Sequence, residues 1–446
     1  MSVNLADRIL AHQGVAVLDA NSGEIFSYQD LNQKVNSYQE ILLKKSGVYG
    51  VKCENSFLNI AFYIACLKTN TPLFLLPENI TDEAVFTLSN QFKLTGVFGR
   101  KHGEALQLFD SEQINFISHS DTAILLSTSG SQFNPRFVRI SMQNLSINSF
   151  DIISSLRNWE NQRAISTLPW HYSYGLSIIN THLLTGNSVI LNQQPIVSEK
   201  FWANIGKYQA TNFGGVPSQY EAIYRLQDKF VNADSIEYIT QAGGKLGLEA
   251  RSEIHKLASK LKRDFYIMYG QTEATARISI LFPEQFKNNA ESVGRCIGKG
   301  IMTEVSGELV FTGGNVCLGY ATEAEHLFQK DCNSGYLYTG DRGSVDSDGF
   351  IYITGRVGRD VKVSGRRISL DTIESQLEKA GICGYALDLD GKIGIVYSSS
   401  EDIEKVTKVL WDDFNILKRD LVFRLTPSIP LLENGKINYR IMRGFF

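Results

Sequence analysis

The stretch FYIMYGQTEAT, residues 265–275, joins a short apolar run to a polar loop that contains a glycine. A run such as FYIMY is typical of a strand that is buried on both faces of an α/β sheet. In such sheets, ligands bind at the loops that follow the carboxyl ends of the strands. The loop from Gly270 to Thr275 therefore lies where an α/β fold places its site.

The same strand pattern recurs upstream, between segments with helical periodicity. Residues 27–47 predict a helix with Ser27 as N-cap, Asp30 three residues later and Gly47 as the stop. Residues 57–77 predict a buried helix that leads into a buried strand. The expected apolar face of the first helix comprises Leu31, Val35, Tyr38, Ile41 and Leu42, and further strands are expected at 121–127, 187–192 and 236–241.

From about residue 292 the pattern changes to short strands and turns, with a hairpin signal at Asp348-Gly349. Residues 357–446 predict a strand, a helix over 370–380, a hairpin at Asp390-Gly391 and a helix over 401–414. We therefore expect an α/β protein in two parts. A large N-terminal domain (1–356) contains αβ-layered sheets and a β-rich subdomain, and a small mobile α+β C-terminal domain (357–446) follows it.

Composition narrows the class of protein. The 446 residues are 43% hydrophobic and 20% charged, and their formal net charge is −3, which favours neither nucleic acid nor an anionic membrane as partner. Six scattered cysteines without a CxxC pair indicate reduced thiols and no metal cage. The N-terminus lacks a secretory signal, and polar residues interrupt the most apolar window. We expect a soluble cytoplasmic protein with no membrane insertion.

A second polar loop follows the strand expected at 121–127. Its sequence TSGS, from Thr128 through Ser129 and Gly130 to Ser131, offers hydroxyls, backbone N–H groups and a close backbone approach to a polyphosphate. No Walker motif and no GxGxxG are present. Further along, Phe133 stands where such a loop would take a glycine, and Arg136 stands where it would take a lysine. We predict that the loop still binds phosphate, with a tip whose shape and charge differ from those of the usual loop.

Several blocks occur in one order along the chain. They are TSGS (128–131), YGQTEAT (269–275), YLYTGD (336–341), FIYITGRVGRDVKVSGRRISLDTIE (350–374) and NGKINYR (434–440). Together they resemble the adenylate-forming superfamily, which includes acyl-CoA synthetases, peptide-synthetase adenylation domains and beetle luciferases. The resemblance implies an acid–thiol ligase that is ATP- and Mg²⁺-dependent and AMP-forming. Such an enzyme activates an acyl or aryl carboxylic acid as an acyl-adenylate and transfers the acyl group to a thiol.

The resemblance also implies roles for residues at the nucleotide. Thr128, Ser129, Gly130 and Ser131 match the loop that holds the β- and γ-phosphates, with Arg136 as a nearby positive charge, and Thr272 matches a phosphate contact. Glu273 matches the carboxylate that holds magnesium, and Lys436 matches the lysine that bridges the substrate carboxylate and the α-phosphate. The walls around adenine and the ribose contacts match Tyr269, Gly270, Gly243, Gly244, Asp341 and Arg356.

In this superfamily the C-terminal domain rotates between the two half-reactions. Lys362 and Gly365 match the face that lines the thiol tunnel, Arg367 matches a residue facing the adenylate phosphate, and Gly358 matches the hinge. Coenzyme A and the phosphopantetheine of a separate carrier protein are both compatible acceptors. Glycine gives the hinge conformational freedom but removes the charge that the family usually has there.

The acid is expected to bind along LPWHYSYGLS (168–177), which contains no acidic residue to pair with an ammonium. A buried ammonium without such a partner is costly, so an α-amino acid is disfavoured. The expected pocket residues are Trp170, Tyr172, Tyr174, Gly175 and Ala242, although some of these rings are expected to be ordinary core packing.

Two alternatives remain open at the level of sequence. The chain could load an amino acid on a carrier protein, or it could be a catalytically degenerate nucleotide-binding homologue, as Phe133 and Arg136 suggest. Singly, Glu273 could be an acid at a helix N-terminus, Asp341 a turn residue and Lys436 a solvated lysine. Their joint order favours the ligase.

Overall fold

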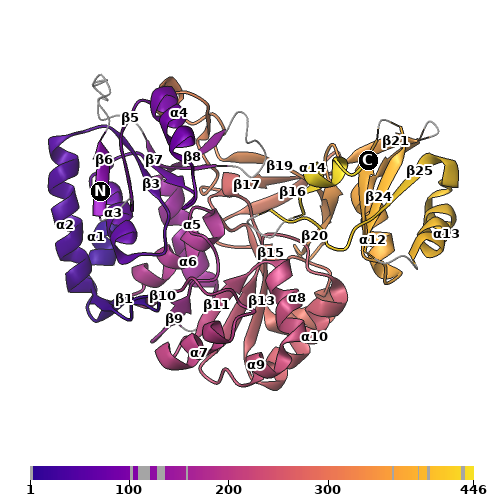
Figure 1. The fold of residues 1–446 in the computed structure, drawn as a ribbon, viewed down its shortest axis with the longest axis horizontal. Coiled ribbons are helices and arrows are strands. Elements are labelled where there is room, and N and C mark those ends of the chain that lie inside the picture. Colours follow the sequence, from indigo (N-terminus) through magenta and orange to yellow (C-terminus); the bar gives the residue numbers. More distant parts are fainter. Residues whose placement is uncertain are drawn as a thin grey trace.

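The computed structural model describes residues 4–100, 104–108, 121–127, 136–156, 159–363, 366–389, 391–398, 402–432 and 437–446. Figure 1 shows a large lobe, which the chain follows from indigo to orange, and a smaller lobe in orange and yellow that carries the C-terminus. The predicted two-part α/β class is confirmed, and the boundary at 356/357 stays a prediction. No helix in the described ranges combines the length and the apolar character that crossing a bilayer requires.

The first sheet of the large lobe has nine strands in the order β15-β14-β13-β12-β11-β9-β10-β1-β2. Neighbouring strands from β13 to β1 run parallel, so their carboxyl ends share one edge of the sheet. The strands are β1 Val15–Asp19, β2 Ile25–Ser27, β9 Arg163–Ile165, β10 Ser188–Leu191, β11 Asn212–Gly215, β12 Tyr238–Gln241, β13 Asp264–Tyr269, β14 Ser279–Leu281 and β15 Arg295–Cys296.

The second sheet has seven strands in the order β18-β8-β7-β4-β3-β5-β6. The strands are β3 Val48–Lys52, β4 Leu73–Leu76, β5 Leu94–Arg100, β6 Glu104–Leu108, β7 Thr122–Ser127, β8 Phe137–Ser141 and β18 Gly319–Ala321. Its last strand, β18, comes from far along the chain and pairs antiparallel with β8. This pairing brings β18 next to β8, the strand that follows the loop expected to bind phosphate in sequence.

The helices of the large lobe alternate with the strands, as predicted. Ser27 caps α2, and its capping box with Asp30 is formed. The predicted apolar face is buried at Leu31, Val35, Tyr38 and Leu42, but Ile41 is 39% exposed, so its assignment to that face was wrong. The helices are α1 Leu5–Leu10, α2 Tyr28–Lys44, α3 Phe57–Lys68, α4 Asp82–Phe92, α5 Met142–Ser155, α6 Ser173–Leu184, α7 Glu199–Tyr208, α8 Pro217–Arg225, α9 Gln227–Val231, α10 Leu248–Lys260 and α11 Phe286–Asn289.

A four-stranded antiparallel sheet, β16-β17-β19-β20, forms the predicted β-rich part. Its strands are β16 Ile301–Val305, β17 Glu308–Thr312, β19 Tyr336–Val345 and β20 Ile351–Arg356. The predicted hairpin at Asp348-Gly349 joins β19 to β20, and Gly349 has a positive φ of 82°. The register of this hairpin places Asp341 opposite Arg356.

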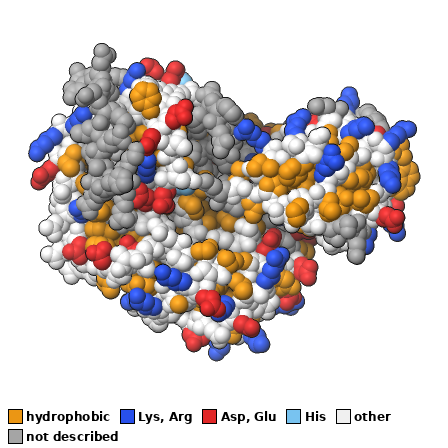
Figure 2. All heavy atoms as spheres, in the orientation of Figure 1, with side chains coloured by type: hydrophobic (Ala, Val, Ile, Leu, Met, Phe, Trp, Pro, Cys, Tyr) orange, Lys and Arg blue, Asp and Glu red, His pale blue; other side chains and the backbone are white. Residues whose placement is uncertain are grey.

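The smaller lobe has a hydrophobic core of its own, which includes Val361, Ile373, Ile393, Val406 and Leu410. Its elements are β21 Asp360–Val363, β22 Arg366–Ser369, α12 Leu370–Lys379, β23 Gly384–Asp388, β24 Ile393–Tyr397, α13 Asp402–Phe414, β25 Leu421–Leu425 and α14 Tyr439–Arg443. Figure 2 shows hydrophobic side chains gathered on the viewed face of this lobe, among lysines and arginines. All six cysteines of the chain are free thiols.

Candidate active site

The site begins at the shared carboxyl edge of β11, β12 and β13. The register aligns Gly215 with Gln241 and Gln241 with Ile267, so Gly243 and Gly270 follow from neighbouring strand ends. Gly243 has φ +86°, which an L side chain adopts at a cost, and a Cβ on Gly270 would lie 1.8 Å from the Ala276 carbonyl oxygen. Both glycines keep the chain close to this edge.

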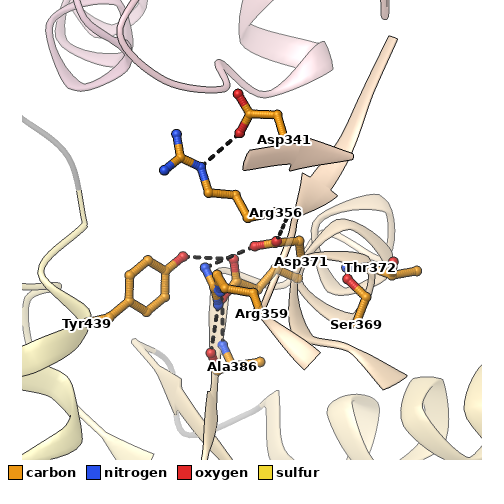
Figure 3. Close-up of polar contacts among 9 residues, drawn as sticks. Asp341, Arg356, Arg359, Ser369, Asp371, Thr372, Ala386 and Tyr439 are labelled. Atoms are coloured by element: carbon orange, nitrogen blue, oxygen red, sulfur yellow. Dashed lines mark hydrogen bonds and ion pairs between the residues drawn. The ribbon is translucent and has the colours of Figure 1, made fainter. Parts of the chain in front are cut away.

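Asp341 reaches the same edge from β19. Tyr269 at the end of β13 donates a hydrogen bond to Asp341 Oδ2 at 2.6 Å, and Arg356 Nε lies 2.9 Å from Asp341 Oδ1. Figure 3 shows the Arg356 side chain directed at Asp341. Burial and the adjacent Asp341 raise the pKa of Tyr269, so its phenol stays protonated and donates. The three residues predicted to bind the nucleoside therefore lie in contact.

Glu273 lies in the short helix η1 (Thr272–Ala274), just beyond the strand end. Its backbone carbonyl accepts a hydrogen bond from Cys317 N at 2.8 Å, and its carboxylate oxygen Oε1 accepts one from Tyr320 at 2.9 Å. Burial, and then the charge of Glu273, raises the pKa of Tyr320, which keeps that phenol a donor. Oε2 of Glu273 has no partner among the described residues and can bind a cation.

Tyr320 also contacts Arg136, a residue predicted to act near the phosphates. The Arg136 guanidinium carbon lies 4.5 Å from the centre of the Tyr320 ring, a cation–π arrangement. Tyr320 thus joins Arg136 to Glu273, and sequence reasoning missed it. A tyrosine in a short strand belongs to no motif, and only the pairing of β18 with β8 brings it to the site.

Several predicted residues lie outside the described part of the chain. They are Thr128, Ser129, Gly130, Ser131, Phe133, Gly365 and Lys436, and the side chain of Arg367 is also not described. The described flanks of the first group, Ser127 and Phe137, pair with each other across β7 and β8. Lys362 is exposed on β21, where it aligns with Arg367 of β22. The roles of these residues stay predictions.

The segment that joins the two lobes is held from both sides. Val357 N donates to the Gly340 carbonyl at 2.8 Å, and Arg356 N donates to Asp371 Oδ2 of α12 at 2.6 Å. Directly after these two anchored residues, Gly358 has a positive φ of 85°. A Cβ at Gly358 would meet no atom within 4 Å, so this φ, rather than crowding, is what favours glycine there.

An ion-pair cluster follows this segment (Figure 3). Arg359 pairs with Asp371 at 3.0 Å and with Glu374 at 2.8 Å, and Tyr439 of α14 donates to Glu374 at 2.9 Å. Burial raises the pKa of Glu374, and the charge of Arg359 acts against that rise. The cluster ties the start of the small lobe to Tyr439, three residues after Lys436 in sequence.

A small cavity of about 20 Å³ lies on the face of the first sheet that α5 and α6 cover. Of the predicted pocket residues, Tyr174 lines it. Trp170 lies instead in the core, 1% exposed, and donates to the Glu54 carbonyl at 3.0 Å. Gly175 packs against the backbone of Pro169, and the Tyr172 ring lies 4.1 Å from that of His171.

The other described residues of the cavity wall come from segments that sequence reasoning did not connect. They are Ile152, Leu156, Trp159, Ser177, Ile178, Thr181, His182, Asn212, Gly214, Tyr238, Thr240 and Arg277. Ala242 is not among them, but it belongs to the same apolar cluster as Tyr238 and lies just beyond Thr240. Arg277 follows Glu273 by four residues in TEATAR (272–277), and this short spacing is the sequence signal that could have identified Arg277.

The described residues contain no group of three or more His, Cys, Asp or Glu side chains that could hold a metal ion. This fits magnesium, which proteins commonly bind through one or two carboxylates together with substrate phosphates. Glu273, one of whose carboxylate oxygens has no partner among the described residues, suits such a site.

Comparison with known proteins agrees with this geometry. The sequence model of the AMP-binding enzyme family matches residues 99–321, which is half of the chain. The chain is 25% identical to a peroxisomal OPC-8:0-CoA ligase of Arabidopsis thaliana, over 82% of this chain and 77% of the relative. It is 22% identical to a 2-succinylbenzoate–CoA ligase of Staphylococcus epidermidis, over 94% of this chain and 92% of the relative.

Among solved structures, the o-succinylbenzoate CoA synthetase of Bacillus subtilis in complex with its acyl-adenylate intermediate superposes with a TM-score of 0.79. Its identity is 18%, and the match covers 97% of this chain and 96% of the other. The chain belongs to the AMP-binding enzyme family. The predicted superfamily, fold class and acid–thiol ligase activity are therefore confirmed.

Proposed function

We propose that the chain uses ATP and Mg²⁺ to convert a small carboxylic acid other than an α-amino acid into an acyl-adenylate, and then transfers the acyl group to a pantetheine thiol. The observation that carries this proposal is the contact of Tyr269, Asp341 and Arg356 at the strand edge that also presents Glu273. The scattered free cysteines support a reducing, cytoplasmic compartment.

In the first half-reaction, a carboxylate oxygen of the acid attacks the α-phosphorus of ATP and pyrophosphate leaves. Asp341 accepts hydrogen bonds from the ribose hydroxyls, held in place by Tyr269 and Arg356. Glu273 would hold Mg²⁺, which would supply charge neutralisation at the phosphates. The ammonium of Lys436 offsets the repulsion between the two anions that must meet.

In the second half-reaction, the thiol attacks the acyl carbonyl and AMP leaves. The small lobe rotates about Gly358, whose backbone already has a positive φ, and the face around Lys362 replaces that of Lys436. Relatives that act on coenzyme A and a D-alanyl carrier protein ligase of Listeria innocua support both kinds of acceptor. We propose coenzyme A first, with a carrier protein as the second acceptor to be tested.

Pyrophosphate–ATP exchange over a panel of carboxylic acids and amino acids tests the proposal. Exchange with carboxylic acids, and its loss in Lys436→Ala, is expected. Coenzyme A and a phosphopantetheine-loaded carrier protein are then supplied separately to identify the acceptor. Binding of ATP without exchange for any acid would contradict the proposal and favour a degenerate homologue, whereas exchange with amino acids alone would overturn the substrate assignment.

A further inference from the structure

Arg277 is held by its backbone beneath the predicted adenylate site. Its N–H donates to Asn148 Oδ1 at 3.2 Å, and its carbonyl accepts from Asn148 Nδ2 at 2.8 Å and from Asn315 Nδ2 at 3.1 Å. The residue is 3% exposed and lines the cavity between the first sheet and α6. Its backbone is therefore fixed from two sides, while its side chain extends along the cavity wall.

The guanidinium has weak partners for a buried cation. It contacts the Met268 thioether, lies 3.5 Å from Ser177 Oγ through Nη2, and stacks 5.1 Å from the centre of the Tyr174 ring. No carboxylate of the described residues pairs with it, and a thioether is a weak acceptor. Since a guanidinium offers five N–H donors, most of those of Arg277 have no strong acceptor in the described structure.

The other buried arginines of the large lobe differ in this respect. Arg139 donates to the carbonyls of Gln329, Leu318 and Lys330. In the same way, Arg251 donates to two carbonyls and Arg263 to three. Backbone carbonyls of the fold thus take donors of all three side chains, although Nε of Arg139 and of Arg251 has no partner among the described residues. No described backbone carbonyl accepts from the guanidinium of Arg277, so its donors are available to a ligand.

Two other polar side chains of the cavity, Tyr174 and His182, have partners within the protein. Tyr174 bonds to the Thr240 carbonyl at 2.8 Å, and His182 bonds to Ile178 O and Asn212 Nδ2. Burial lowers the pKa of His182 to about 4, so it is neutral at neutral pH. Burial lowers the pKa of Arg277 to about 10, which leaves it cationic at that pH. Among the described lining residues, Arg277 thus supplies the positive charge.

The cavity is placed to receive the distal end of the acid. Thr240 lines it, and Ala242, two residues further along, lies in the same apolar cluster near the strand edge. Alternate residues of a strand face the same side and lie about 7 Å apart. An acid activated at the strand edge therefore extends its other end past Ala242 and Thr240, toward the wall that Arg277 occupies.

Building on the proposed function, we propose that the acid bound here carries a second anionic group, most simply a second carboxylate, and that Arg277 binds it. A carboxylate supplies two acceptor oxygens that match the planar donor fork of arginine. The second group is not activated; its role is to anchor the acid so that the first carboxylate meets the α-phosphate. Arg277 is thereby a specificity-determining residue for this ligase.

The test compares acids that differ in the second group alone. Pyrophosphate–ATP exchange is measured with glutaric, adipic, pimelic and suberic acids, with the benzenedicarboxylic acids, and with the monomethyl ester of each. We expect kcat/KM for the best free diacid to exceed that of its monoester by on the order of 10- to 100-fold, the range expected for hydrogen bonds to a charged group.

Variants then assign the preference to Arg277. Arg277→Gln is expected to lower kcat/KM for the diacid to that of its monoester, chiefly through KM, and Arg277→Lys is expected to restore part of the preference. Arg251→Gln is the matched control, since it removes a buried arginine of α10 that donates to the backbone carbonyls of Ala290 and Ser292. The diacid/monoester ratio of this control is expected to equal that of the unmodified chain.

The outcomes separate the inference from the function on which it rests. Exchange that is as strong with monoesters as with diacids, or a diacid preference that survives Arg277→Gln, overturns the inference and leaves the ligase intact. Exchange with no acid of either series, while ATP still binds, overturns the proposed function and the inference with it. If Arg277→Gln does not fold, the diacid/monoester ratio of the unmodified chain still tests the inference, because a ratio near one overturns it.

Discussion

The two ends of the proposed site differ in how their charges are paired. At the nucleotide end, Asp341 contacts Tyr269 and Arg356, and Glu273 contacts Tyr320. In the cavity, Arg277 has only a thioether, a distant hydroxyl and an aromatic face among the described residues. The nucleotide end is thus already arranged by the protein, as suits a ligand that every member of the family shares. The cavity leaves its charge for the acid to satisfy.

The difference indicates where selectivity lies. Changes at the nucleotide end should affect all acids equally, because each acid reacts with the same nucleotide. Changes at Arg277 should alter kcat/KM by an amount that depends on the second group of the acid. Experiments on single residues test this division between the two ends.

The largest effect is expected from Glu273→Gln. The amide keeps an acceptor for Tyr320 but loses the negative charge that would hold Mg²⁺. The rate of pyrophosphate–ATP exchange should fall by on the order of 10²–10³ for every acid tested, the scale of losing one strong electrostatic contact to a transition state. A loss that differs between diacids and monoesters would contradict the division between the two ends.

The next effect concerns the pH dependence of the free energy of unfolding, to which His182 in the cavity wall contributes. His182 has a folded-state pKa of about 4 against 6.5 in the unfolded chain, so the unfolded state binds more protons between these values. Its contribution is present above pH 6.5 and is lost as the pH falls toward 4, by on the order of 3 kcal/mol. The free energy of unfolding, measured by denaturant titration across this window, should fall less steeply in His182→Met. An unchanged slope would mean that His182 is already charged in the folded cavity.

A smaller effect is expected from Asp341→Asn. The amide can still accept one hydrogen bond but loses the ion pair with Arg356 and the charged acceptor for the ribose. KM for ATP should rise by on the order of 10- to 100-fold, while the ratio of kcat/KM between any two acids stays constant. Steady-state kinetics at saturating acid measures the first quantity. A shift in acid preference would place Asp341 in the acid pocket instead.

The smallest effect is a gain in stability from Arg277→Met. Replacing a buried cation that pairs with no described carboxylate by an apolar side chain of similar length should raise the free energy of unfolding by about 1–2 kcal/mol. Arg139→Met is the contrasting variant, because it leaves the carbonyls of Gln329, Leu318 and Lys330 without their donor and should destabilise the protein. Equal losses in the two variants would show that Arg277 supports the fold in the way Arg139 does.

Sequence reasoning predicted the elements whose signals are local. The helix capped at Ser27, the strand before Gly270 and the hairpin at Asp348-Gly349 all have local patterns, and the structure contains them. Ile41 was wrongly assigned to the buried face of its helix. Helical periodicity gives the direction of the apolar face, but it does not show how far neighbouring elements extend over that face. Asp341 and Tyr269, both named from the family motifs, lie in contact in the structure, and their roles stay predictions.

Residues that depend on long-range packing were missed. Tyr320 reaches Glu273 because β18 pairs with a strand that lies far away in sequence. The cavity is assembled from α5, α6, β11, β12 and the loop before β14, and no sequence window contains these together. For the same reason Trp170, which the local pattern assigned to the pocket, lies in the core beside Tyr63.

The central claim is that the acid is activated by bonding one of its carboxylate oxygens to the α-phosphorus of ATP. The most direct test supplies an acid with ¹⁸O in its carboxylates, together with ATP, Mg²⁺ and coenzyme A, and analyses the products by mass spectrometry. The account predicts AMP carrying one ¹⁸O atom, unlabelled pyrophosphate, and an acyl thioester whose carbonyl oxygen is ¹⁸O. AMP without the label, or ADP with ¹⁸O in inorganic phosphate, would contradict it.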